Sequence, residues 1–105
     1  MGFAASLGGL RSLVATITYL QANHAWENVN WGKVDSLFQI TTRLQPRYEN
    51  YWDEAAWHMA YNAASSYLYN EEIEPMVRGK LYEEHVRRGI DILNEGLRYL
   101  PDDAR

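Results

Sequence analysis

The sequence has no cysteine, and it contains only three prolines and two phenylalanines among its 105 residues. Without cysteine, the chain has neither disulfide bonds nor thiolate metal sites, and its redox compartment is left open. It also lacks an Asn-x-Ser/Thr acceptor, so nothing in it indicates a glycosylated surface. Lysine and arginine together number ten against fourteen acidic residues, which argues against a nucleic-acid binder with a basic face.

Apolar residues, in contrast, make up 47% of the chain and include four tryptophans and eight tyrosines. A chain of this composition is too hydrophobic to remain disordered. Its length is enough for one domain with a modest core. We therefore expect a single folded domain over residues 1–105.

The first 22 residues are apolar, but their polar groups do not suit a membrane anchor. Arg11 lies in the middle of the stretch, whereas a signal peptide has its positive charge before the apolar part. A transmembrane helix needs about 20 predominantly apolar residues, and six polar side chains interrupt this one. We predict a buried or partner-facing helix, no membrane partner for this segment, and an unknown localisation with the cytoplasm as default.

Helical spacing of the apolar residues predicts four helices and no strand. The expected helices span residues 9–26, 31–44, 48–69 and 75–99. Pro46 ends the second helix, because the residue before a proline is driven out of the α region, and Pro101 ends the fourth in the same way. Short breaks between amphipathic helices imply antiparallel neighbours. On the fourth helix the apolar stripe consists of Val77, Leu81, Val86, Ile90, Leu93 and Leu97.

Two of these helices end alike, with "LQP" at residues 44–46 and "YLP" at residues 99–101. If Pro46 closes a unit of 34 residues, Ala15 opens that unit and Glu49 opens the next. Small and aromatic residues then recur in register. In the first unit they are Ala22, Trp31, Val34, Phe38 and Leu44, and in the second they are Trp52, Ala56, Gly89, Leu93 and Gly96. This pattern resembles the tetratricopeptide repeat, a helix–turn–helix unit of 34 residues.

The resemblance covers roughly residues 15–105 and has two departures. Thr18 and Thr41 stand where the family usually has tryptophan and alanine. The second unit, residues 49–101, exceeds a regular unit by about 21 residues, and we expect this surplus, around residues 65–85, to lengthen both of its helices. The resemblance implies antiparallel hairpins stacked as an α-solenoid segment. The final "PDDAR" predicts a fragment of a longer repeat protein, and an unrelated four-helix bundle is the alternative.

Glu54 and His58 form the one constellation with a metal-like spacing, since residues four apart share a helix face. Neither Glu-x-x-His nor His-Glu-x-x-His occurs, so a hydrogen-bonded histidine near the core is the alternative. The acidic pairs of the sequence fit a solvated helix face, and Asp53 and Glu54 also suit the negatively charged start of a helix. We predict no catalytic residue, no cofactor and no metal.

Aromatic residues of the third helix are the candidates for partner binding. Trp57, Tyr61 and Asn62 lie on a different face from the expected packing residues, and the resemblance implies that this face is concave. The alternative is that they pack against the long neighbouring helix. Leu13 and Ile17 of the first helix have no preceding unit to cover them, so we expect homo-oligomerisation there or on the outer face of the fourth helix.

The sequence therefore predicts a non-enzymatic scaffold that binds a protein or peptide partner, or a second copy of itself. Two alternatives stay open. One is a small helical-bundle enzyme or metal- or ligand-binding protein that uses Glu54 and His58 with a carboxylate from the fourth helix. The other is the soluble stub of a membrane-associated envelope protein.

Overall fold

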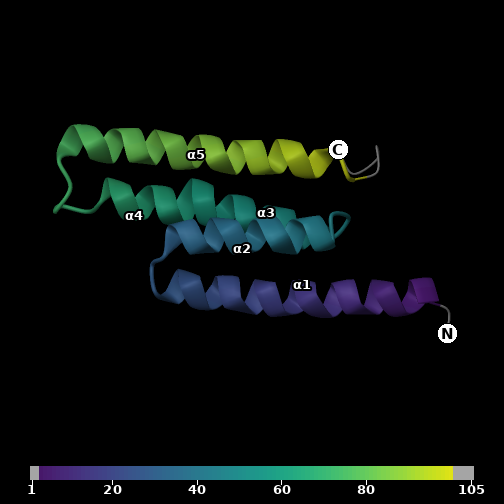
Figure 1. The fold of residues 1–105 in the computed structure, drawn as a ribbon. Coiled ribbons are helices and arrows are strands. Elements are labelled where there is room, and N and C mark those ends of the chain that lie inside the picture. Colours follow the sequence, from purple (N-terminus) through teal and green to yellow (C-terminus); the bar gives the residue numbers. More distant parts are fainter. Residues whose placement is uncertain (1–2, 101–105) are drawn as a thin grey trace.

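Two antiparallel helical hairpins make up the computed structural model, which describes residues 3–100 and their side chains from residue 7 on (Figure 1). The first hairpin consists of α1 (Phe3–Glu27) and α2 (Trp31–Leu44). The second pairs a long helix with α5 (Pro75–Leu97). That long helix runs without a break through α3 (Glu49–Trp57), the π-helix η1 (His58–Ala63) and α4 (Ala64–Leu68). The prediction of an all-α fold with about four helices is confirmed within these residues.

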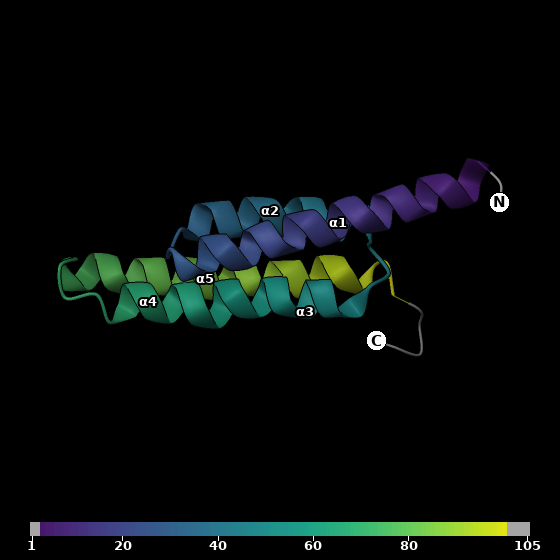
Figure 2. The ribbon, with the colours of Figure 1, turned by 90° about the horizontal axis from the view of Figure 1, so that it is seen from below.

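The molecule is a thin slab whose α-carbon extents are 57 × 31 × 13 Å. Figure 1 shows its helices in the order α1, α2, long helix and α5. Seen from below, α1 and α2 lie on one side, and the long helix and α5 lie on the other (Figure 2). The N-terminal part of α1 extends beyond its neighbours in both views. The overhang leaves this part of α1 with no helix beside it.

The turn between α1 and α2 satisfies the backbone groups that the helix end leaves open. The amide of Val29 donates to the carbonyl of Trp26, and that of Asn30 to the carbonyl of Ala25, both at 2.9 Å. These two bonds form a Schellman motif, which needs a left-handed residue at its centre. Val29 fills that place with a φ of 57°, although a β-branched residue is strained there. The side chain of Asn30 then caps α2 by accepting from the Lys33 amide.

Pro46 ends α2 as predicted, and it also anchors the second hairpin. The indole nitrogen of Trp52 donates to the Pro46 carbonyl at 2.7 Å. The Trp52 ring is buried and stacks on Tyr99 at 5.7 Å. Trp52 therefore joins the turn before the long helix to the end of α5.

The core lies between the two hairpins and draws on all four helices. Its largest fully buried side chains are Phe38, Met59, Val34 and Thr41. Thr41 is polar, but its hydroxyl lies 2.6 Å from that of Thr18, which satisfies a hydrogen bond between α1 and α2. Two threonines thus occupy this helix–helix contact as a bonded pair.

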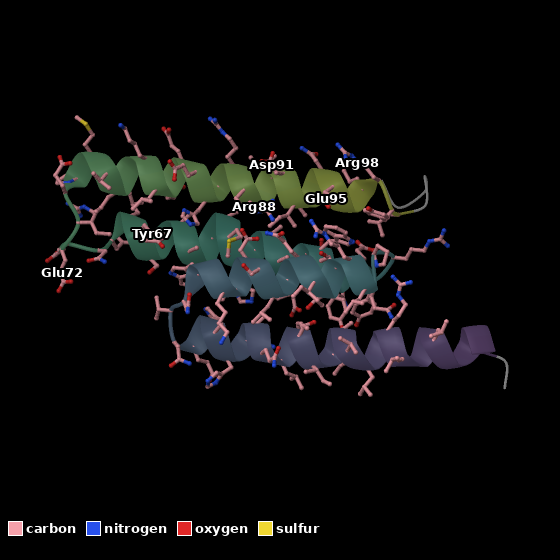
Figure 3. The ribbon with its side chains drawn as sticks, in the orientation of Figure 1. Tyr67, Glu72, Arg88, Asp91, Glu95 and Arg98 are labelled. Carbon is pink, nitrogen blue, oxygen red and sulfur yellow. The ribbon has the colours of Figure 1, made fainter. Side chains whose placement is uncertain are left out.

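One ion pair ties α2 to α5. The guanidinium of Arg88 donates to both carboxylate oxygens of Asp35, with distances of 2.9 to 3.2 Å. Figure 3, in which Arg88 is labelled, shows its side chain on the side of α5 that faces the other helices. The hydrogen bonds to Asp35 raise the pKa of Arg88, while partial burial opposes this. Bidentate geometry of this kind fixes orientation as well as distance between two helices.

Glycine residues let α5 approach the long helix closely. A β-carbon on Gly89 would lie 2.5 Å from the β-carbon of Ala60 and 2.9 Å from the carbonyl oxygen of Ala56. A β-carbon on Gly96 would lie 2.7 Å from Cγ of the Trp52 ring. Side chains at either position would force the two helices apart.

Three predicted helix bounds were wrong. α1 begins at Phe3 rather than at residue 9, because Gly8 and Gly9 weaken a helix without ending it. α5 ends at Leu97 rather than at residue 99. The helix predicted over residues 48–69 spans 49–68 and contains the π-helix, which no periodic pattern announced. Pro101 and "PDDAR" lie outside the described residues.

The stripe predicted for the fourth helix was also wrong in part. Ile90, Leu93 and Leu97 are exposed, and the face of α5 that packs inward carries Gly89, Ile92 and Gly96. The two faces are adjacent on the helix. Hydrophobic spacing identified the aliphatic face because glycine contributes nothing to such a pattern, although here it lines the contact.

We predict that Gly89→Ala destabilises the fold by about 1–3 kcal/mol, because the methyl group overlaps Ala60 and a backbone oxygen. Gly79→Ala on the same helix is the matched control, since a β-carbon there meets no atom within 4 Å. That variant gains about 0.5–1 kcal/mol from helix propensity. Urea unfolding followed by circular dichroism measures both. Equal stability changes of the same sign would contradict the close contact.

Candidate functional site

The first helices of the two hairpins, α1 and α3, contact each other through polar and aromatic side chains. The hydroxyl of Tyr19 donates to Oε1 of Glu54 at 2.9 Å. Its ring lies 5.2 Å from that of Tyr51. Further along, the rings of Trp26 and His58 are 5.2 Å apart. Pairing of the two helices along this line leaves a surface shared between the hairpins.

That shared surface is hollowed into what we call the aromatic groove, a cavity of about 390 Å³. Two residues of α1 and four of the long helix line it: Asn23, Trp26, Asp53, Glu54, Trp57 and His58. Its volume lies within the range of small-ligand and side-chain pockets. The lining combines two indole rings with two carboxylates, and it contains no lysine or arginine.

Trp57 and Tyr61, two of the predicted partner-binding residues, are exposed by 53% and 59%. Their rings stack on each other at 5.0 Å and 22°. Packing of both rings against the neighbouring long helix was the alternative, and this exposure contradicts it. Trp57 lines the groove, and Tyr61 supports it from the side that faces solvent. An exposed indole held by a neighbouring ring is preordered for contact with a partner.

His58 forms the buried end of the groove. Its ring contacts Trp26, and also Phe38 at 5.4 Å. The amide nitrogen of Asn62 lies 3.0 Å from Nδ1 of His58. Because an amide N–H can only donate, Nδ1 accepts this bond and the imidazole is neutral, with its proton on Nε2. Burial lowers the pKa of His58 below its usual value of 6.5, and the nearby Glu54 carboxylate opposes that shift.

The π-helix η1 supplies the groove-lining His58 together with Tyr61 and Asn62. Its wider turn shifts the later residues of the long helix relative to a regular α-helix. As a result, Ala63 and Ala64 still face the core while Tyr61 faces solvent. Single π-helical turns inside α-helices occur often at functional sites.

Leu13 and Ile17, the remaining predicted residues, lie away from the aromatic groove. Leu13 is 57% exposed, and Ile17 lines a separate, shallow hollow with Lys33 of α2. The structure therefore groups Trp57, Tyr61 and Asn62 on one surface and leaves the α1 pair on another. All the exposed aliphatic residues of α1 belong to this second surface, the α1 outer face: Leu7, Leu10, Leu13, Val14, Ile17 and Leu20.

Among residues 3–100, no group of three or more His, Asp or Glu side chains is arranged to hold a metal ion. Glu54 and His58 thus stand as a pair, with Glu54 bonded to Tyr19 and His58 to Asn62. In the same part of the chain, no helix combines the length and apolar character needed to cross a bilayer.

Sequence reasoning missed Asn23 and Trp26, which form the α1 side of the groove. A signal for one of them was present. Asn23 precedes Trp57 by 34 residues, the length of one repeat unit, so both hold the same place in their units. Extending the partner-binding prediction from Trp57 to its equivalent place would have identified Asn23. Trp26 carries no such mark.

Comparisons with models of protein families, with curated proteins and with solved structures find no match to this chain.

We predict that the free energy of unfolding falls as pH decreases below about 6.5, because unfolded His58 binds a proton that the folded site disfavours. The loss begins near the unfolded pKa and ends near the lower folded one. His58→Gln removes this contribution, so its stability changes less with pH between about 5.5 and 7.5. Urea unfolding at several pH values measures it. An NMR titration midpoint of His58 at or above 6.5 would refute the prediction.

Proposed function

We propose that this chain is a non-enzymatic helical-repeat scaffold that binds a protein or peptide partner in the aromatic groove. The observation that carries the proposal is the pair of partly exposed indoles, Trp26 and Trp57, facing one cavity between the two hairpins. Tryptophan is enriched among the residues that dominate binding energy at interfaces. Groove residues on two different hairpins suit an extended peptide or a helix laid across both.

The repeat assignment rests on packing that agrees with the tetratricopeptide pattern. Ala22, Val34 and Phe38 are buried at the expected places of the first unit, and Trp52 and Ala56 at those of the second. Gly89 and Gly96 occupy tight contacts where that pattern requires small residues. Leu93 departs from it by being exposed. On this assignment the groove belongs to the first helices of both units, the ones that line the concave surface in the family.

Selection from random peptides of about twelve residues on the immobilised chain tests the proposal. We expect selected peptides whose affinity falls by about tenfold or more in Trp57→Ala, because an interface loses its central aromatic anchor. Tyr69→Ala is the matched control, since Tyr69 is an exposed aromatic residue beyond the end of α4. Isothermal titration calorimetry measures each affinity, and circular dichroism checks folding. Peptides that bind both variants as well as they bind the unsubstituted chain would refute the groove as the binding surface.

Self-association through the α1 outer face is a second candidate function. Six exposed aliphatic side chains lie on one side of a helix whose residues 3–23 carry a single charge, Arg11. Exposed apolar surfaces of this kind mark interaction sites in soluble proteins. A second copy offers the same apolar face, and pairing two such faces removes both from water.

We predict a dimer whose dissociation constant rises by about tenfold or more in Leu13→Asp, because a carboxylate enters an apolar interface. Val77→Asp is the control, since Val77 is exposed at the start of α5, where a negative charge is tolerated. Light scattering over a concentration series measures the mass. A monomer at every concentration of the unsubstituted chain would rule out this candidate.

A further inference from the structure

The electrostatics of the aromatic groove point to the chemistry of its occupant. Asp53 and Glu54 place two carboxylates on the lining, and no cationic side chain among the lining residues offsets them. His58 adds no positive charge, because Asn62 donates to its Nδ1 and the ring is neutral. An apolar side chain filling the groove would take both carboxylates out of water without a partner, which is costly.

Glu54 is held in position before any partner arrives. Its Oε1 accepts the hydrogen bond from Tyr19 of α1, so the carboxylate is fixed between the two hairpins rather than mobile in solvent. A fixed carboxylate loses less conformational freedom when it pairs with a cation. Tyr19 therefore acts as a positioning residue for the charge at the groove.

The indole rings supply the second element of a cation site. Trp26 and Trp57 are exposed by 41% and 53%, and their rings lie 5.2 and 6.0 Å from that of His58. The face of an indole attracts a cation electrostatically, and tryptophan does so best among aromatic residues. A planar guanidinium can stack on an indole while it donates to a carboxylate, which a lysine ammonium cannot do.

Resting on the proposed function, we infer that the aromatic groove takes an arginine side chain of the partner, stacked on Trp57 or Trp26 and paired with Glu54 and Asp53. This assigns the anchor of the partner segment. The charge of the groove thereby selects against acidic segments, since a carboxylate there would face two others.

Indole N–H signals in a proton–nitrogen correlation spectrum test the assignment at residue level. The probe is the peptide acetyl-Ala-Leu-Arg-Leu-Ala-amide, and its control carries citrulline, a neutral isostere of arginine. We expect saturable shifts of the Trp26 and Trp57 signals, with about tenfold weaker binding of the citrulline peptide. The buried Trp31 and Trp52 report any general disturbance of the fold. Binding that weakens as salt is added would agree with an ionic contact.

Isosteric variants identify the carboxylates involved. The double variant Asp53→Asn with Glu54→Gln should lose about tenfold in affinity for the arginine peptide and none for the citrulline peptide. Glu83→Gln with Glu84→Gln makes the same charge change on the exposed face of α5 and should leave both unchanged.

Equal binding of the two peptides, an unaffected double variant, or no shift of the Trp26 and Trp57 signals would each overturn the inference. The proposed function fails separately, when peptides from the random selection are insensitive to Trp57→Ala. If such peptides require Trp57 but lack arginine, the groove binds a partner and only its assigned anchor is wrong.

Discussion

The approach of α5 to the long helix is the constraint on which the rest of the structure depends. Gly89 lies against Ala60 and the backbone of Ala56, and Gly96 lies against the Trp52 ring. With α5 at this distance, Arg88 reaches Asp35 on α2, and Trp52 stacks on Tyr99 while it bonds to the Pro46 carbonyl. The first hairpin is therefore positioned through contacts that require two positions without side chains. Attractive forces alone would not select this arrangement, since a bulkier α5 buries more surface at a larger spacing.

The groove shows how the same packing produces a surface with a defined chemistry. Its buried end is an imidazole that burial and the Asn62 hydrogen bond keep neutral. Its open end has two indoles, and its charge comes from Asp53 and Glu54. Each of these groups has a structural partner within the fold: Tyr19 for Glu54, Tyr61 for Trp57, and Phe38 for His58. The arrangement is suited to recognition through contact and charge, with the groups ordered in advance of binding.

Much of this fold could be predicted from local patterns, while the groove could not. Helical spacing and Pro46 located α2 to the residue, because periodicity and proline act within a few residues. The inward face of α5 was misassigned because Gly89 and Gly96 carry no hydrophobic signal, although they make the closest contacts. The π-helix escaped prediction because its extra residue per turn leaves no local mark in His58–Ala63. Trp57 and Tyr61 were singled out as aromatic residues beside the packing face. Trp26 was missed because its role depends on how α1 lies against α3, a relation between distant segments that neither helix encodes alone.

The thinness of the slab gives the groove a mechanical character. Its two walls belong to different hairpins, α1 to the first and the long helix to the second. The bending stiffness of a plate falls steeply with thickness, so a body 13 Å across in its short direction flexes more readily than a globule of equal mass. A small rotation of one hairpin against the other widens or narrows the groove and leaves the glycine contacts inside the second hairpin intact. A partner seated between the walls acts as a brace that stiffens the whole array, so occupancy at one place is transmitted as rigidity along its 57 Å length.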